Sequence, residues 1–338
     1  MIARTICLYG ATDSGKTAQA GRFARHIYES SGKITRYIGA DGGDWLGILR
    51  PYVDAGIIEP WSILPLAARK QSVFGAAHRL ARGEWPVPTA DGKALTFGLP
   101  TDETWRRVGA YVWDSGTGLA ELIEAEMKAS PNMTSGKEQT FKYAVDGESM
   151  SGGSWDHIRA TQDTIKRLVI YSGNLPVDRV LWTFGEHGGE EEITRKSIYG
   201  PAVVGKASTG KLPKDFGLLL HCETSLQAAT TQSAIAGQPG PGYVQKRRIY
   251  YMSHPDPVTG VLYPAKPRVP PEMYPLLKAK WVGGYLEPEI IATGEMANGL
   301  DAFLAFEDSL SGKFNAATKA WKEKTDAGRQ SNPATPKD

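Results

Sequence analysis

Short apolar runs and helical patterns alternate along the first 130 residues of the chain. The runs at Thr5–Tyr9, Thr35–Asp41 and Ala110–Asp114 have the length of buried strands. Between them, apolar residues recur at helical spacing from Lys16 to Ser31 and again around Trp45–Ala55. This alternation of strand and helix predicts an α/β fold, in which a mostly parallel sheet carries helices on its faces.

The second half of the chain predicts further elements of both kinds. A long helix is expected over residues 155–172, followed by a buried strand in "DRVLWTFGEH", residues 178–187. Residues 216–224 and 246–254 predict two later strands, either antiparallel or added at an edge of the sheet. A last helix is expected from Gly299 to Lys324. Its apolar face would consist of Leu300, Phe303, Leu304 and Phe306.

The chain is expected to fold as one large core, residues 1–290, with a C-terminal helical extension over residues 291–324. Residues 325–338 are polar and predict a disordered tail. Within the core, residues 82–104 are rich in Gly, Pro and Asp and predict a hairpin or a loop insertion. Residues 130–154 hold many polar and few aliphatic residues, so we expect a loop insertion with weak order.

Composition and charge narrow the class of protein. Apolar residues make up 41% of the chain and charged residues 22%, as in soluble globular proteins. No apolar run approaches the roughly 20 residues that cross a bilayer, and the first residues lack the pattern of a secretory leader. We therefore expect a cytoplasmic protein with no membrane partner. The net charge of +2 is too small to indicate nucleic-acid binding by itself, so any such contact must come from local patches.

Two cysteines, Cys7 and Cys222, each lie in an apolar stretch that predicts a strand. This placement favours buried, reduced thiols over a disulfide. Two cysteines without histidines at matching spacing also argue against a structural zinc site.

The strongest motif follows the first predicted strand and precedes the first predicted helix. It matches G-x-x-x-x-G-K-[ST] in full. Its residues are Gly10, Ala11, Thr12, Asp13, Ser14, Gly15, Lys16 and Thr17. Glycines let successive backbone N–H groups face a phosphate, and the helix N-terminus adds the positive end of its dipole. We expect Lys16 to reach the β and γ phosphates of ATP and the Thr17 hydroxyl to bind Mg²⁺.

A second acidic element is needed to hold the Mg²⁺, and Asp114 in "YVWDS" fits. Three apolar residues carry it to the carboxyl end of a buried strand, where ligands bind in open α/β sheets. The alternative is that Asp114 only caps the next helix. The following residue is Ser115, whereas many nucleotide-hydrolysing motors have a glutamate there, so the carboxylate that activates water must lie elsewhere or be missing.

Three carboxylates are candidates for that catalytic role. Asp41 and Asp44 follow the second predicted strand, and Glu186 follows the strand "VLWTF". Each of them has the alternative of being an ordinary loop carboxylate. His187, next to Glu186, is a candidate sensor of the γ-phosphate.

Several stretches together resemble the RecA-like P-loop ATPases encoded by bacteriophages, above all the short ATPases associated with single-strand annealing and recombination. The resemblance covers residues 3–270 and rests on "YGATDSGKT", "YVWDSGTGL", "VLWTFGEH" and "GPAVVGKASTGKLPKDFGLLLHCET". It implies a RecA-like core with antiparallel additions to its sheet, binding of ATP and Mg²⁺, and assembly as a homo-oligomer. It also implies action on single-stranded DNA beside phage or host replication and recombination proteins, in the cytoplasm of a bacterial host.

In that group, a Lys-x-Arg pair often reaches the γ-phosphate of the neighbouring subunit. Lys266 and Arg268 stand in a suitable place for this role, and the alternative is a solvated pair in a Pro-rich loop. The chain departs from the group's pattern in its long middle insertions and its C-terminal extension, which argues against a role in annealing alone.

Basic residues cluster in three places that suit single-stranded DNA, and aromatic residues accompany them in two of these places. The first is "KRR", Lys246–Arg248, followed by Tyr250 and Tyr251. The second is the loop with Lys206, Lys211 and Lys214, and the third is the insertion with Lys137, Phe141, Lys142 and Tyr143. The alternatives are an ordinary amphipathic strand and ordinary surface lysines.

The sequence thus favours a Mg²⁺-dependent ATPase that acts on DNA in recombination, replication or repair. One alternative is a nucleotide-dependent switch or assembly factor that binds protein partners and hydrolyses little ATP. Another is a small-molecule kinase; no arginine-rich lid follows the Asp114 strand, although the loop at Arg82–Arg107 could serve as one. Hydrolysis stimulated by DNA, binding without turnover, and phosphate transfer to a metabolite distinguish the three.

Overall fold

The fold is taken from a computed structural model of the chain. It describes residues 3–69, 71–88, 95–129, 140–145, 148–153, 156–190, 197–205, 210–228, 243–267, 269, 271–290, 296–297, 299–310 and 312. The predicted tail, residues 325–338, and residues 313–324 of the last predicted helix lie outside this set. None of the described helices combines the length and the apolar character needed to cross a membrane.

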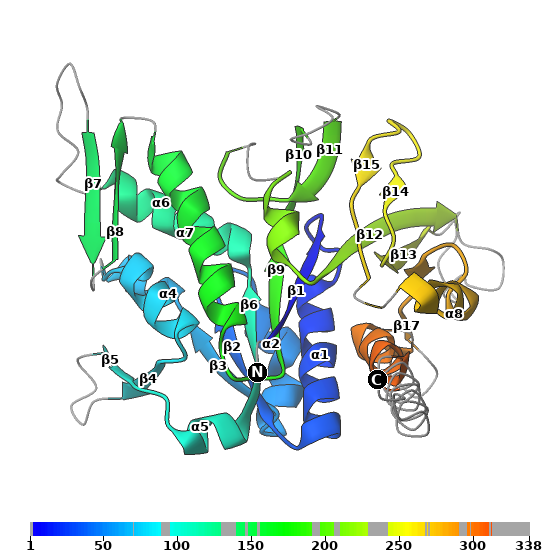
Figure 1. Cartoon of the computed structure of the whole chain (residues 1–338), viewed down its shortest axis with the longest axis horizontal. Coiled ribbons are helices and arrows are strands. Elements are labelled where there is room, and N and C mark those ends of the chain that lie inside the picture. Colours follow the sequence, from blue (N-terminus) through cyan, green and yellow to red (C-terminus); the bar gives the residue numbers. More distant parts are fainter. Residues whose placement is uncertain are drawn as a thin grey trace, which may run out of the picture.

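A large sheet forms the centre of the described chain, with strands in the order β16-β13-β12-β1-β9-β6-β2-β3 (Figure 1). Their bounds are β1 (Arg4–Gly10), β2 (Ile34–Gly39), β3 (Ile58–Ser62), β6 (Val108–Asp114), β9 (Arg179–Phe184), β12 (Leu218–Ala228), β13 (Tyr243–Tyr250) and β16 (Tyr285–Leu286). The neighbours from β12 to β3 pair in parallel, whereas β13 and β16 are antiparallel. The predicted α/β class, mostly parallel with antiparallel additions, is confirmed.

One expectation about this sheet was wrong. β12 is neither antiparallel to the core strands nor at an edge, because it pairs in parallel with β1 along Ile6–Gly10. Its run of leucines is buried on both sides, as a central parallel strand requires. The following strand, β13, adds on in the antiparallel direction, and β16 pairs antiparallel to β13.

Helices cover both faces of the sheet. One face carries α4 (Val73–Ala81), α6 (Gly116–Lys128) and α7 (Asp156–Gly173), and the other carries α1 (Lys16–Ser31), α2 (Trp45–Asp54) and the helical residues 300–310. The smaller helices are α3 (Leu64–Ala68), α5 (Asp102–Arg107), α8 (Tyr274–Lys280), η2 (Leu212–Asp215) and η3 (Pro271–Met273). The positions of α1, α2 and α7 confirm the helical patterns found in the sequence.

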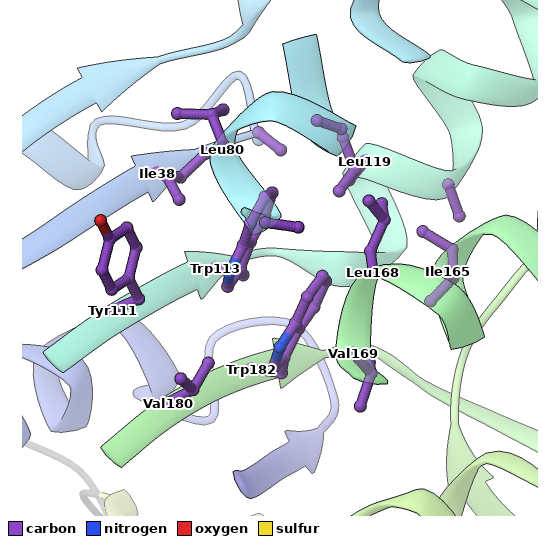
Figure 2. Packing of buried hydrophobic residues seen from close by; sticks show 14 of the residues in the cluster. Ile38, Leu80, Tyr111, Trp113, Leu119, Ile165, Leu168, Val169, Val180 and Trp182 are labelled. Atoms are coloured by element: carbon purple, nitrogen blue, oxygen red, sulfur yellow. The ribbon is translucent and has the colours of Figure 1, made fainter. Parts of the chain in front are cut away.

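Two stacked tryptophans form the centre of the first face. The rings of Trp113 on β6 and Trp182 on β9 lie 4.6 Å apart and are nearly parallel, at 3°. Leu119 of α6 and Leu168 of α7 pack over them (Figure 2). Trp113 directly precedes Asp114, so this packing fixes the strand end that carries the predicted metal ligand.

The helical residues 300–310 dock on the second face against α1. Leu300, Phe303 and Leu304 are buried there, as predicted. Asp308 accepts hydrogen bonds from Arg4 at 3.0 Å and from the buried Arg179. Burial alone would raise the pKa of Asp308, but His26 and the two arginines hold it below its ordinary value. The C-terminal segment is therefore joined to the first strand of the core by charge as well as by apolar contact.

A second sheet stands at the carboxyl ends of the central strands (Figure 1). It consists of β10 (Glu186–Glu190), β11 (Ser197–Pro201), β15 (Leu262–Tyr263) and β14 (His254–Pro255), in that order. The sequence analysis assigned no such sheet, because its strands are short and lie in glycine-rich and proline-rich stretches.

Three two-stranded hairpins complete the described elements: β4 (Trp85–Pro88) with β5 (Leu95–Gly98), β7 (Thr140–Val145) with β8 (Glu148–Gly153), and β17 (Glu289–Ile290) with β18 (Met296–Ala297). The first lies within residues 82–104, for which the sequence predicted a hairpin or a loop insertion. The second corrects the loop expected over residues 130–154. Thr, Phe, Tyr and Val in β7 favour strands, and two such segments satisfy their backbone groups by pairing with each other.

Candidate functional site

The predicted phosphate-binding loop connects β1 to α1, as the motif requires. A Cβ atom on Gly10 would lie 2.0 Å from the carbonyl oxygen of Cys222 on β12, so only glycine fits. Gly15 has a φ of +88°, in the left-handed region that glycine adopts without strain. These two residues let the loop turn tightly at the N-terminus of α1, where backbone N–H groups suit an anion.

Lys16 lies within the curl of this loop. Its ammonium donates hydrogen bonds to the carbonyl oxygens of Gly10 at 2.9 Å and Ala11 at 2.6 Å, and to Ser14 Oγ at 3.3 Å. Burial lowers the pKa of Lys16, while Cys222 and the nearby carboxylates of Asp114, Glu186 and Asp41 act in the opposite direction. These carboxylates therefore lie close enough to Lys16 to stabilise its charged form.

Asp114 meets the loop across the sheet. Thr17 Oγ1 donates a hydrogen bond to Asp114 Oδ2 at 2.7 Å, although the two residues are 97 positions apart. Tyr37 on β2 and Thr183 on β9 also donate to this carboxylate, which is 3% exposed. Burial, and then the charge of Asp114, raise the pKa of Tyr37, so Tyr37 stays a donor.

The alternative for Asp114, a helix cap, is not what the structure shows. Ser115 caps α6, since its hydroxyl accepts from the backbone N–H of Gly118 at 3.0 Å. Asp114 is left to contact Thr17. A threonine hydroxyl and a carboxylate are hard oxygen donors, and Mg²⁺ prefers such ligands in nucleotide sites. The residues present therefore fit a magnesium ion.

The three candidate bases have different environments. Asp41 follows β2 and accepts a hydrogen bond from Ser115 Oγ at 2.8 Å. Asp44 is exposed and caps α2 by accepting from the N–H of Gly47 at 3.0 Å, which gives it a structural role. The third, Glu186, opens β10 beside the exposed His187. The structure thus brings Asp41 and Glu186 to the loop lysine, and their catalytic roles stay predictions.

The contact between Ser115 and Asp41 predicts a change in pH dependence. Partial burial raises the pKa of Asp41, and the hydrogen bond from Ser115 opposes this by favouring the charged form. Replacing Ser115 with alanine should raise the pKa of Asp41 further. If ionised Asp41 activates water, the acid limb of kcat/KM for ATP hydrolysis should move to higher pH.

The control for this prediction is Ser72→Ala. In α4, the Ser72 hydroxyl accepts a hydrogen bond from the N–H of Gly75 at 2.9 Å, so this variant removes an equivalent helix cap and leaves Asp41 unchanged. Each variant should lose about 1 kcal/mol of stability through its cap. An acid limb that does not move in Ser115→Ala would assign the base to another carboxylate.

Glu186 belongs to a hydrogen-bonded chain that the sequence did not indicate. Its Oε2 lies 3.0 Å from His221 Nε2, and His221 Nδ1 lies 2.9 Å from His254 Nε2. The ring of Tyr263 stacks on His221 at 4.2 Å, and His221 is 1% exposed. Burial, helped by His221, lowers the pKa of His254 to about 4. The chain runs from Glu186 on β10 through His221 on β12 to His254 on β14, so it links the central sheet to the second sheet.

Of the predicted Lys-x-Arg pair, the structure describes Lys266. The backbone of Lys266 bridges to Leu219, three residues before Cys222, which lies beside Gly10. The side chain of Lys266 lines a pocket together with Tyr251 and other residues. Arg268 lies outside the described residues, and a contact of this pair with a neighbouring subunit stays a prediction.

The basic patches predicted for DNA are only partly described. Lys246 and Arg248 face Glu287, at 4.0 Å and 2.9 Å, and Arg248 also covers the ring of Tyr285. Lys211 is the N-cap of η2, and Lys214 lies within η2. Of the third patch, the structure describes the strand β7, and Lys137 lies outside the described residues. Lys206 of the second patch also lies outside them.

The sheet and the loop together define an α/β fold of the P-loop type. No protein-family model matches the chain. Two curated relatives, the chloroplastic pyruvate, phosphate dikinases of Flaveria trinervia and Flaveria bidentis, are each 29% identical to it over 82 residues. That match covers 24% of this chain and only 9% of each relative's length.

Two solved structures resemble the fold over most of the chain. A KaiC-like protein from Pyrococcus horikoshii OT3 is 13% identical, with a TM-score of 0.35, and the match covers 78% of this chain and 90% of that protein. The flagellar accessory protein FlaH from Methanocaldococcus jannaschii is 9% identical, with a TM-score of 0.39 and 88% of each chain covered. Both likenesses are remote, so we derive function from the site.

Proposed function

We propose that this chain is a Mg²⁺-dependent ATPase of RecA-like type that binds ATP in the loop Gly10–Thr17. The observation that carries the proposal is the 2.7 Å contact between Thr17 Oγ1 and Asp114 Oδ2. It joins the end of a phosphate-binding loop to an acidic residue at the carboxyl end of a buried strand. These are the two protein ligands that a nucleotide-bound magnesium ion takes in such sites.

Each residue then has a defined task. The loop N–H groups and Lys16 hold the phosphates, and Thr17 and Asp114 hold the metal ion, which supplies neutralisation of phosphate charge. Tyr37 and Thr183 keep the carboxylate of Asp114 in place. Asp41, oriented by Ser115, and Glu186, oriented by His221, are the carboxylates positioned to accept a proton from water.

The polymer on which this ATPase acts is, in this proposal, single-stranded DNA. The support is the sequence resemblance to phage ATPases of recombination and the lysines near η2, Lys211 and Lys214. The chain would work as a homo-oligomer, in recombination, replication or repair, with phage or host proteins as partners in the bacterial cytoplasm.

Hydrolysis of ATP by the purified protein, with and without single-stranded DNA, tests the proposal. We expect DNA to raise the rate several-fold, with a steep decrease as salt increases, and the variant Lys16→Ala to lose the activity. ATP binding with negligible turnover would instead indicate the nucleotide-dependent switch. That alternative is favoured by Ser115, which stands where many nucleotide-hydrolysing motors have a glutamate. Transfer of phosphate to a metabolite would indicate the kinase.

A further inference from the structure

β13 runs close to the phosphate-binding loop, two strands from β1. Gly10 lies beside Cys222 of β12, and Cys222 lies opposite Ile249 of β13. Side chains alternate between the two faces along a strand. Ile249 belongs to the apolar cluster on the face of α1, so Arg247 extends to that face and Arg248 to the other.

Arg247 lies across the end of the loop. A Cβ atom on Gly15 would be 3.2 Å from Cδ, 3.4 Å from Nε and 3.7 Å from Cζ of Arg247. Gly15 is the N-cap of α1 and directly precedes Lys16. The Arg247 side chain therefore lies next to Gly15, at the point where the phosphate-binding loop passes into its helix.

Positive charge accumulates at this point. Burial raises the pKa of Cys222 to about 12, while Lys16 and Arg247 both act on this thiol in the opposite direction. The N-terminus of α1 adds the positive end of its dipole. A cation at a helix N-terminus is unfavourable by itself. A bound anion with several negative charges makes the arrangement favourable, because it attracts both the cation and the helix N-terminus.

The guanidinium also has the shape for a phosphate. Its planar fork presents parallel N–H donors that match two phosphate oxygens, which an ammonium does not. We propose that Arg247 contacts the phosphate chain of the bound nucleotide from within the same chain. This inference rests on the proposed function, and it adds a nucleotide ligand outside the loop motif. Nucleotide binding would then join β13 to the loop.

The test compares Arg247→Gln with Arg248→Gln. The two arginines are adjacent on one strand and face opposite sides, and Arg248 is held by Glu287 at 2.9 Å. We expect Arg247→Gln to weaken the binding of fluorescent ADP and ATP about tenfold, the effect of one charged hydrogen-bonding group. Arg248→Gln should stay within about twofold of the wild type, and Arg247→Lys should fall between them because it keeps the charge and loses the fork.

The melting temperature of each variant without nucleotide shows whether it is folded, and its rise with ADP gives a second measure of binding. If Arg247→Gln does not fold, Arg247→Lys against Arg248→Lys makes the same comparison. Unchanged nucleotide binding in Arg247→Gln, or an equal loss of binding in Arg248→Gln, would overturn the inference. The proposed nucleotide site would still stand in that case if Lys16→Ala loses binding. If Lys16→Ala also binds like the wild type, the proposed function fails as well.

Discussion

Replacing Asp114 with asparagine is expected to lower kcat for ATP hydrolysis at least about a hundredfold. Asparagine keeps the shape of the side chain, and its amide still offers partners to the hydroxyls of Thr17, Tyr37 and Thr183. The variant should therefore fold. It removes the negative charge that a magnesium ion requires from its ligand. Binding of ADP should become insensitive to Mg²⁺, which calorimetric titration with and without the metal measures.

Asp54→Asn is the matched control for this experiment. It makes the same chemical change at an exposed carboxylate in the last turn of α2, where Asp54 pairs with Arg50 at 2.8 Å. We expect its activity to equal that of the wild type, because exposed ion pairs of this kind contribute little. Hydrolysis by Asp114→Asn within a few-fold of the wild type would refute the assignment of Asp114 as a metal ligand.

Replacing Trp182 with alanine should cost about 3–5 kcal/mol of unfolding free energy. The ring is fully buried, stacks on Trp113 at 4.6 Å, and donates from Nε1 to Ser172 Oγ at 3.2 Å. Removing it opens a cavity between the sheet and the helices α6 and α7, and close-packed interiors collapse only partly around such a loss. Urea unfolding followed by fluorescence and circular dichroism gives the change in free energy.

The same change should also weaken the site. Trp182 precedes Thr183, and Trp113 precedes Asp114, so the stacked pair supports both strand ends that hold the candidate metal site. Trp182→Phe keeps an aromatic ring in the stack and is expected to cost less stability and to preserve activity. Wild-type activity in folded Trp182→Ala would mean that the stack does not position the carboxylate.

The meeting of the loop Gly10–Thr17 with Asp114 was predictable from the sequence because both signals are local. A fixed spacing of glycines, lysine and threonine defines the loop, and an apolar run ending in aspartate defines the strand end. Tyr37 and Thr183 were not predictable as partners of Asp114. A hydroxyl inside a buried strand looks like any other strand residue until the order of the strands is known.

The basic run in β13 shows a similar limit. In the sequence, Lys246, Arg247 and Arg248 form one patch that suits DNA. In the structure, the strand's alternation sends Arg247 to the loop and the other two to Glu287. Which residues of a strand share a face follows from its period of two, but what each face meets depends on neighbours that lie far away in the sequence.

The fold class followed from the alternation of strands and helices, because long periodic segments carry a strong signal. The second sheet did not, since two-residue strands such as β14 and β15 have no period to detect. They exist because long-range contacts hold them, among them the stacked rings of Tyr199 and Tyr263 at 4.6 Å.

The chain of Glu186, His221 and His254 restricts where hydrogens lie. When Glu186 is ionised and both rings are neutral, the carboxylate only accepts, so His221 carries its hydrogen on Nε2. Its Nδ1 then accepts, and His254 must carry its hydrogen on Nε2. The carboxylate that opens β10 thus determines, through His221 of the central sheet, which nitrogen of His254 on β14 bears the hydrogen.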